Sequence, residues 1–545
     1  MSAIARCSNY LISPPTNRGA HPATMGSSWS CNMFREENEG INYLASVPGL
    51  KYWKKFTDTP KRCRGAYVST VGLASNGQKE NAFVCFGDTV YRIDYAGNIE
   101  SIGTVSAGSV RVVFAETGGL RPMLLVADGH NLWAYDILEG GTLKQVTLPQ
   151  RVTGAGGMIQ PTHVAVVGGS VCVNDVGSGF VYYSIPYPLN NEEREVFETH
   201  MVDGKLEPVY DEDNPLKVKT KKVDALTYML YDDYGVQQYF NAESASDNVV
   251  SITAVGANLY LFGSKTVEIW QRGSGEYETW IRQSYTTNAS NGLQAPYSVA
   301  VCGSNLYYLG SGESYAKGIL SVSGQVYTKI SDDWLDQKLL KETSDTAYGF
   351  AYALGSHNFY VLQLQNLQET WVYDLDTKEW HQRVSRVLES GAESRWRPSA
   401  LIWYRGEFLT FCNDGAAYRH MDDYWYEDFY DTDRLPMVRH RQGAVLVNNN
   451  MPFIFEELAI ECNVGCWNDY KLQPQLLLEV SKDGGNTFGN VRSCALGRTG
   501  DYSHRVRYLG LGMNRLCVLR VTYSHPTSLE LTSCSQRISE TTAVI

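Results

Sequence analysis

The chain has 545 residues, of which 43% are hydrophobic and 19% charged, a balance typical of a globular protein with substantial cores. Its net charge of −12 argues against a basic surface that wraps nucleic acid, and no apolar run reaches the roughly 18 residues that a membrane-spanning helix needs. The 36 tyrosines and 12 tryptophans favour β-strands and recognition surfaces.

The N-terminal region, residues 1–60, is predicted to form an arm and strands that pack on the next domain. It is a poor signal peptide, because Arg6, Ser8 and Asn9 interrupt its short apolar stretch. The 12 cysteines of the chain lie mostly inside apolar runs such as AFVCFG and RLCVLR, so we expect buried reduced thiols, which suit assembly in a reducing cytoplasm.

Short strand signals then recur as a repeat. Each unit contains an apolar run, a turn rich in Gly, Asn or Asp, and a second run that ends in aromatic residues, as in NAFVCFGDTVYRIDYAGN. The seven copies begin near residues 82, 122, 163, 251, 297, 348 and 399.

A period of about 40 to 50 residues with several short strands per unit indicates the blades of a β-propeller. We therefore expect an all-β protein with a propeller over residues 61–435, with six to eight blades and seven as the best estimate. Two stacked β-sandwiches are the alternative, but they would give less regular spacing.

One longer interval contains an insertion at about residues 187–245. It begins with the acidic NNEEREVFE and later becomes basic at KVKTKK. It is either a solvated loop with charges of both signs or a protruding arm that contacts a partner, because long insertions in compact folds tend to be functional.

The repeat stops near residue 436, and longer strands predict a separate β-sandwich-like domain over residues 436–545. Just before this boundary lies MDDYWYEDFYDTD, residues 421–433. Its clustered carboxylates could bind a cation such as Ca²⁺, although the spacing does not match an EF-hand loop. The stretch could instead bind a partner through its aromatic residues, or simply link the two domains.

Within the C-terminal region, SKDGGNTF (Ser481–Phe488) resembles the Asp-box hairpin of sialidase-type propellers. In such a turn Asp483 accepts hydrogen bonds from its own backbone, Gly484 and Gly485 permit positive φ, and the aromatic residue packs underneath. None of these roles is catalytic, and the motif occurs once. We interpret it as a structural turn.

Searches for catalytic, cofactor and metal sites predict none. The sequence contains no Walker loop, GxSxG elbow or HExxH helix, and its 10 histidines show no close pair at ligand spacing. Cys462 and Cys466 could form half of a zinc site, but no second pair follows at zinc spacing. The paired carboxylates of a generic glycosidase, in contrast, leave no sequence pattern to search for.

Two segments resemble the packaged-DNA stabilisation proteins of short-tailed phages, also called tail accessory factors or tail nozzles. They are YFNAESASDNVVSITAVGANLYLFGSKTVEIWQRGSG (Tyr239–Gly275) and NGLQAPYSVAVCGSNLYYLGSG (Asn291–Gly312). The first carries the family's pattern at Asp247, Leu261–Gly263 and Thr266–Trp270. SCNMFREENEG, LASVPGL and RGAY near the N-terminus and LLLEVSKDGGNTFGN near the C-terminus are also similar, whereas the charged insertion has no counterpart.

The resemblance implies a virion protein without enzymatic activity or cofactor, assembled in the host cytoplasm. Such proteins form a ring, commonly a hexamer, below the portal and its adaptor. The ring extends the DNA channel, helps retain the packaged genome, lets double-stranded DNA pass without sequence specificity, and offers attachment for fibres, spikes or a needle. An acidic channel wall would repel DNA weakly and not slow its exit.

Two other classes of function stay open at this point. A propeller glycosidase or carbohydrate-binding tail protein requires carboxylates and arginines that converge in the central pocket. A cellular propeller scaffold or lectin would show more regular blade sequences than these degenerate repeats.

Overall fold

The structure is a computed structural model that carries side chains. It describes residues 5–8, 11, 28–38, 40–69, 81–119, 121–152, 156–184, 193–202, 205–211, 214, 217–242, 247–273, 280–283, 291–312, 315–343, 345–430, 432–447, 451–464, 473–497 and 500–540.

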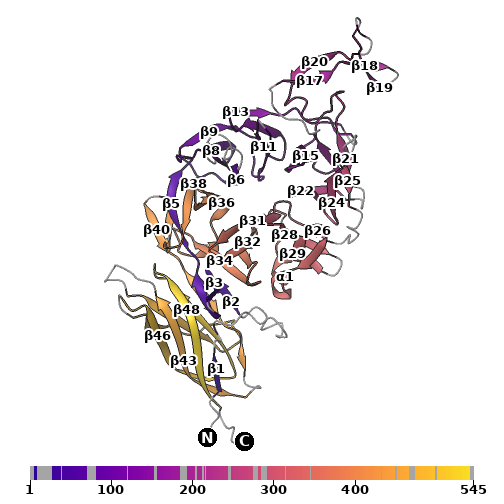
Figure 1. The fold of residues 1–545 in the computed structure, drawn as a ribbon. Helices are drawn as coiled ribbons and strands as arrows, with labels where there is room; N and C mark the ends of the chain where they lie inside the picture. Colours follow the sequence, from indigo (N-terminus) through magenta and orange to yellow (C-terminus); the bar gives the residue numbers. More distant parts are fainter. Residues whose placement is uncertain are drawn as a thin grey trace.

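The described residues form an all-β fold with two parts, a β-propeller and a C-terminal β-sandwich (Figure 1). Their single helix, α1 (Asp333–Leu339), begins after Asp332, whose carboxylate accepts a hydrogen bond from the backbone N–H of Leu335 at 2.8 Å. Within these residues no helix is both long enough and apolar enough to cross a membrane.

The propeller part contains seven sheets among the described residues, and the first strand of each faces the centre of a ring. From the centre outward, the first sheet contains β6 (Cys63–Ser69), β7 (Asn81–Phe86), β8 (Thr89–Ile93) and β9 (Ile99–Thr104), the second contains β10 (Val113–Glu116), β11 (Met123–Ala127), β12 (Leu132–Asp136) and β13 (Gly140–Gln145), and the third contains β14 (Val164–Val167), β15 (Ser170–Asn174), β16 (Phe180–Tyr183) and β21 (Tyr239–Asn241). The fourth sheet contains β22 (Val249–Val255), β23 (Asn258–Gly263), β24 (Val267–Arg272) and β25 (Trp280–Arg282), and the fifth contains β26 (Gly292–Leu293) and β27 (Ala300–Cys302), then β28 (Asn305–Gly312), β29 (Tyr315–Ser323) and β30 (Val326–Lys329). The sixth sheet contains β31 (Tyr348–Leu354), β32 (His357–Leu364), β33 (Glu369–Asp374) and β34 (Trp380–Arg386), with β35 (Glu393–Arg395) beside β34, and the seventh contains β36 (Pro398–Tyr404), β37 (Glu407–Cys412), β38 (Ala416–Met421), β5 (Gly49–Lys55), β39 (Tyr426–Phe429) and β40 (Asp433–Pro436).

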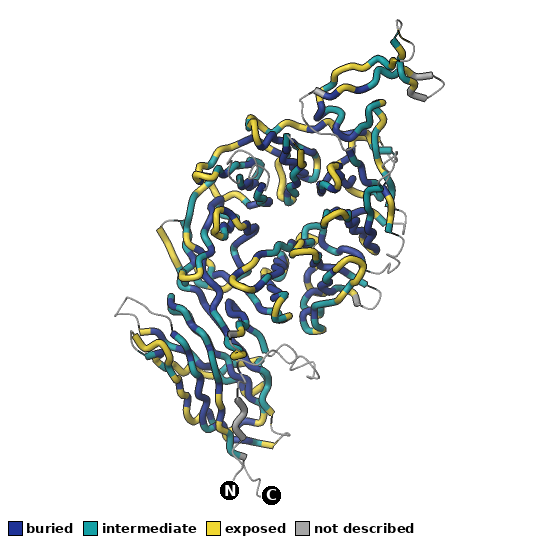
Figure 2. The backbone as a smooth tube through the Cα atoms, viewed as in Figure 1, coloured by how far each residue is buried: buried dark blue, intermediate teal, exposed yellow. Residues whose placement is uncertain are grey.

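Continuous apolar runs form the central strands because both faces of each sheet are covered. Successive side chains of a strand point to opposite faces. In β7, Phe83 and Cys85 therefore pack toward the next sheet of the ring, whereas Val84 and Phe86 pack toward the last sheet. Figure 2 shows such buried residues in every sheet of the ring and between the layers of the sandwich.

The ring is closed by a strand from the N-terminal region. Strand β5 pairs antiparallel with β38, with Leu50 opposite His420 and Tyr52 opposite Tyr418. The core between the last and first sheets, which includes Phe86 and Phe411, is then complete.

The sandwich has two layers around one apolar core. One layer contains β1 (Ala5–Ser8), β3 (Met33–Asn38), β4 (Ile41–Ser46), β43 (Phe453–Val464), β46 (Ser503–Asn514) and β48 (Leu529–Glu540); the other contains β2 (Trp29–Cys31), β41 (Arg439–Gln442), β42 (Leu446–Val447), β44 (Gln475–Ser481), β45 (Arg492–Ala495) and β47 (Leu516–Tyr523). Strand β2 also pairs with β34, so this second layer continues directly into a sheet of the ring.

The sequence predicted that residues 1–60 pack on the propeller, but the described strands of this region are divided between the propeller and the sandwich. Strand β5 packs on the propeller, but β1 and β4 pair with β48 of the sandwich, and β3 pairs with β4. Alternating strands such as β3 can complete either kind of sheet, and long-range pairing decides which. We propose the boundary between the two parts after Pro436, where β40 ends, and before Arg439, where β41 begins.

The insertion contains four strands beyond the ring, at the upper right of Figure 1. Strand β17 (Glu193–Phe197) pairs with β20 (Thr220–Asp224), and β18 (Thr199–Val202) pairs with β19 (Lys205–Pro208) at the tip.

Gly49→Ala is expected to weaken ring closure. A Cβ at this position would lie 2.1 Å from the backbone oxygen of Tyr426, so β5 and β39 must separate. We expect a loss of about 2 kcal/mol in the free energy of unfolding, measured by urea denaturation. Gly118→Ala is the matched control, because a Cβ there meets no atom within 4 Å. Equal stability of the two variants would contradict the role assigned to β5.

Candidate functional site

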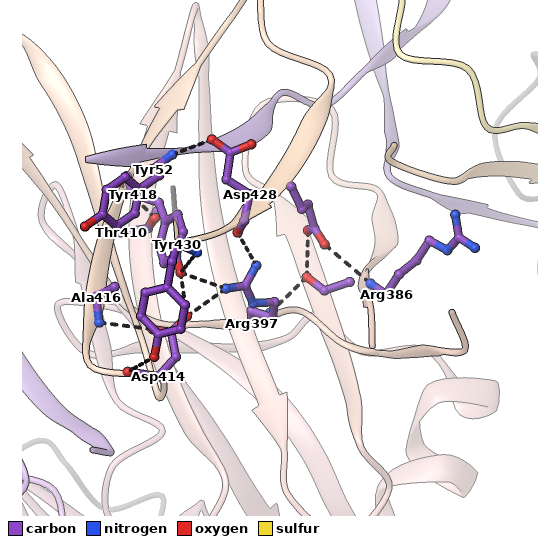
Figure 3. A network of polar contacts seen from close by, with 11 residues as sticks. Tyr52, Arg386, Arg397, Thr410, Asp414, Ala416, Tyr418, Asp428 and Tyr430 are labelled. Carbon is purple, nitrogen blue, oxygen red and sulfur yellow. Dashed lines mark hydrogen bonds and ion pairs between the residues drawn. The ribbon is translucent and has the colours of Figure 1, made fainter. Parts of the chain in front are cut away.

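The acidic and aromatic stretch 421–433 lies in the last sheet of the ring, where it contains β39 and the start of β40 (Figure 3). Its strand β39 runs parallel to β5, and the Asp428 carboxylate accepts a hydrogen bond from the backbone N–H of Tyr52 at 2.8 Å. Of its other acidic residues, Glu427 is buried, while Asp431 lies outside the described residues. The structure therefore uses Glu427 and Asp428 in contacts within the protein, whereas Asp422, Asp423 and Asp433 are exposed.

Arg397 is the centre of the polar network that holds this stretch in place (Figure 3). Its guanidinium donates to the Asp428 carbonyl at 2.8 Å, to the Asp414 carboxylate at 2.8 Å and to the Tyr418 hydroxyl at 3.0 Å. The same group lies 3.9 Å from the centre of the Phe429 ring, a cation–π contact. Sequence reasoning did not find Arg397, because nothing local marks an arginine whose partners are distributed over β38, β39 and a turn.

Glu427 is the most deeply buried acid of the stretch, with 2% of its surface exposed. Its carboxylate accepts hydrogen bonds from the Ser385 hydroxyl at 2.7 Å and from the backbone N–H of Arg386 at 3.4 Å. Burial raises the pKa of Glu427, and the positive charge of Arg397 opposes this shift. The group joins β39 to the neighbouring sheet and is closed to solvent.

The SKDGGNTF segment forms the turn that the sequence predicted. The Asp483 carboxylate accepts hydrogen bonds from the backbone N–H groups of Asn486 at 3.0 Å and Thr487 at 2.9 Å, and from the Thr487 hydroxyl at 2.5 Å. Gly484 and Gly485 have positive φ. These hydrogen bonds lower the pKa of Asp483. The aromatic residue at the end of the motif packs under a guanidinium, that of Arg520, 3.8 Å from the ring centre.

One histidine–carboxylate group was missed by sequence reasoning. His357, Asp374 and Asp376 place possible ligand atoms within 4.8 Å of one another. His357 Nδ1 lies 2.8 Å from Asp374 and its Nε2 lies 3.5 Å from Glu36, and the hydrogen bond to Asp374 raises the pKa of His357. The other oxygen of Asp374 accepts the backbone N–H of Asp376 at 3.0 Å. These contacts fix a turn and join β32 to β3 of the sandwich; the only local signal was the DLD spacing.

Cysteine chemistry contributes no site among the described residues. Ten cysteines have described side chains, and none of these ten pairs with another in a disulfide. Cys462 is buried in the sandwich core, where burial raises its pKa. Its suggested zinc partner, Cys466, lies outside the described residues.

The base of the insertion is fixed to the ring. Leu226, Met229 and Leu230 are buried in the core between the sheets of β11 and β15. Arg194 on β17 is also buried, and it donates hydrogen bonds to the carbonyls of Tyr228 at 3.1 Å and Tyr231 at 3.0 Å. The insertion is thus an anchored arm with two hairpins.

The outer part of the arm offers charged and aromatic side chains to solvent. Tyr210 is 51% exposed, and Lys217, Lys221 and Lys222 are exposed on or beside β20. A basic strip on a protein of net charge −12 can attract an acidic surface, including one on another copy of the chain.

A channel runs through the centre of the ring, with a volume of about 520 Å³. Its wall is contributed by the seven sheets and is mostly aliphatic, with Val112, Val164 and Val299 among its residues. Of the described residues that line it, Glu116 is the single carboxylate. The size is that of a small-molecule pocket.

Two family models match the chain, and together they take in more than half of its 545 residues. Residues 230–419 match the β-propeller of bacteriophage P22 Gp10, and residues 439–539 match the β-sandwich of the same protein. A search of curated proteins finds no match.

Some solved structures are similar at low identity. A streptogramin B lyase is 10% identical, with a TM-score of 0.39 over 68% of this chain and 97% of its own. Virginiamycin B lyase from Staphylococcus aureus is 10% identical, with 0.38 over 68% and 98%. BamB from Moraxella catarrhalis is 11% identical, with 0.30 over 68% and 97%. TM-scores this low carry no argument about function.

Glu427→Gln is expected to change how stability depends on pH. The raised pKa means that the folded protein binds a proton on the Glu427 carboxyl more tightly than the unfolded chain does. Below the ordinary pKa of 4.5, the protonated carboxyl therefore makes its full contribution to the stability of the folded state. That contribution is lost as pH rises through the raised pKa, by at most about 1.4 kcal/mol per pH unit. Urea unfolding from about pH 4 to about pH 8 should therefore show the wild type losing stability relative to the variant.

The exposed Glu407, on the same sheet, provides the matched control as Glu407→Gln. Its pH profile should follow that of the wild type. Parallel profiles for the wild type and Glu427→Gln would contradict the assignment of Glu427 as a buried acid with a raised pKa.

Proposed function

Because the chain belongs to the family of bacteriophage P22 Gp10, and so is a structural protein of a phage tail, we propose that it forms the tail nozzle. About six copies form a ring below the portal and its adaptor. The ring extends the DNA channel, helps retain the packaged genome and provides attachment for fibres, spikes or a needle.

The observation that supports this proposal best is that two different parts project from the propeller of each chain. The arm of the insertion and the sandwich project from opposite sides of the propeller (Figure 1). A closed ring of identical subunits uses heterologous interfaces, so each subunit must offer two different surfaces. The arm and the sandwich supply such a pair.

The charge of the protein supports passage of DNA without adhesion. With a net charge of −12, the assembled wall would repel phosphates weakly. DNA would then leave the head without binding tightly to the channel.

The sequence left a propeller glycosidase as the alternative. That chemistry requires two carboxylates that face each other across the substrate. Among the described residues that line the propeller channel, Glu116 is the single carboxylate, so no such facing pair is found there.

The mass of the purified protein tests the proposal. Light scattering of the protein alone should give about six times the subunit mass of 60.9 kDa. When it is mixed with tail-less DNA-filled particles, the particles should bind it. Particles that take it up should stop losing DNA. A stable monomer that does not bind the particles would overturn the proposal.

Removal of the arm tip is expected to separate folding from assembly. Residues 199–218 can be replaced by Asn-Gly, because Glu198 already donates its backbone N–H to the Lys219 carbonyl at 2.9 Å. The anchored base stays, so Tm measured by calorimetry should stay close to that of the wild type. The mass should fall below that of the ring, or uptake by particles should be lost.

A variant with reversed charges on the arm serves as the comparison for the deletion of residues 199–218. Lys221→Glu and Lys222→Glu keep the arm but reverse its basic strip, and they should weaken the same contact. If both the deletion and the charge reversal leave ring and uptake unchanged, the arm is not a contact surface.

A further inference from the structure

One end of the central channel gathers arginines from residues that are distant in the sequence. Arg62 and Arg111 precede the innermost strands β6 and β10, and Arg395 lies just before β36. Because innermost strands of neighbouring sheets start side by side, their preceding residues meet at one mouth of the channel. Arg111 itself lines the channel.

Arg111 is held so that one of its nitrogens has no acceptor. Its guanidinium stacks on the Tyr348 ring at 4.1 Å, and Nη2 donates to the Ser399 carbonyl at 3.0 Å. Nη1 is buried and has no hydrogen-bond partner among the described residues. A buried N–H without an acceptor is costly, so the position is suited to an acceptor from outside the chain.

Tyr297 provides a second unpartnered group at the same mouth. Its ring stacks on His163, with centroids 5.0 Å apart, and its hydroxyl is buried without a partner in the part of the chain that the structure describes. His163 cannot serve it, because its ring nitrogens already contact Thr162 at 2.9 Å and the Pro296 carbonyl at 3.2 Å. Burial raises the pKa of Tyr297 to about 12, so the hydroxyl remains a donor at neutral pH.

Positive charge exceeds negative charge around these two groups. The Arg62 side chain has no hydrogen bond or ion pair among the described residues, and Arg395 donates only to uncharged acceptors, the Tyr348 hydroxyl and Gln363. Burial lowers the pKa of Arg62, and the charges of Arg111 and Arg395 lower it further.

The carboxylates near the mouth do not neutralise this charge. Asp128 accepts hydrogen bonds from four N–H groups, those of residues 106, 130, 131 and 133. Asp414 is paired with Arg397 at 2.8 Å, and Asp345 is exposed. Arg64 adds a further cation, held by four backbone carbonyls.

We propose that this mouth is a binding site for a phosphate-class oxyanion, held by Arg111 Nη1, the Tyr297 hydroxyl and the guanidinium of Arg62. The forked donors of arginine match the oxygens of phosphate, and the positive charge of each guanidinium strengthens the contacts. The site takes either free phosphate or a backbone phosphate of a nucleic acid that reaches the mouth.

The test is titration of inorganic phosphate into the full chain by calorimetry, with ionic strength kept constant by sodium chloride. Binding of one phosphate per chain is expected. Arg62→Gln should weaken it about tenfold, because a charge-assisted contact is lost. Tyr297→Phe should also weaken it and leave Tm without phosphate unchanged, since the hydroxyl has no hydrogen bond to the described residues.

The matched control is Arg405→Gln, at the opposite end of β36, where Arg405 stacks on Tyr95 at 5.0 Å. It should leave phosphate binding unchanged. Absence of heat beyond that of chloride would overturn the proposal, because water alone would then fill the mouth. An equal loss of affinity in Arg405→Gln and Arg62→Gln would also overturn it.

A short DNA duplex added to the phosphate-bound protein identifies the source of the oxyanion. Displacement of phosphate by the duplex indicates a nucleic-acid backbone, and phosphate binding that DNA does not affect indicates a free ion. Both results support the site. The test uses the isolated chain, so its failure would leave the proposed ring untouched.

Discussion

Coverage of both faces of every sheet in the ring is the constraint on which the rest of this structure depends. A small twisted sheet cannot bury its apolar residues alone, and an open ring would leave the first and last sheets bare. Strand β5 solves this by pairing with β38, so that residues more than 350 positions apart in the chain share one sheet. Trp53 of β5 packs against the core around Phe86 and Phe411.

Closure by an N-terminal strand also ties the sandwich to the ring. The same N-terminal region supplies β2, which lies between β34 of the ring and β41 of the sandwich. Beside it, the Asn32 amide donates to the carbonyls of Val384 at 3.0 Å and Val438 at 2.8 Å, one on each side of the joint. The two parts are therefore connected by backbone pairing as well as by side chains.

The sequence predicted the ring well where burial is two-sided. Runs such as AFVCF in β7 and MLLVA in β11 are fully apolar because neighbours cover both faces. The predicted repeats near residues 82 and 122 nevertheless begin at the second strand of their sheets. The innermost strands β6 and β10 carry polar residues such as Arg64 and Glu116, so their hydrophobic pattern is weak.

The sites are harder to predict because they are made by neighbours in space. The Asp483 turn could be read locally, since its donors lie within four residues. Arg111 and Tyr297, in contrast, are 186 positions apart, and ring closure alone brings the starts of their strands to one mouth. In a propeller, the residues that precede each innermost strand therefore come together at one mouth of the channel. Each sheet contributes one such position, and the group forms only when the last sheet packs against the first.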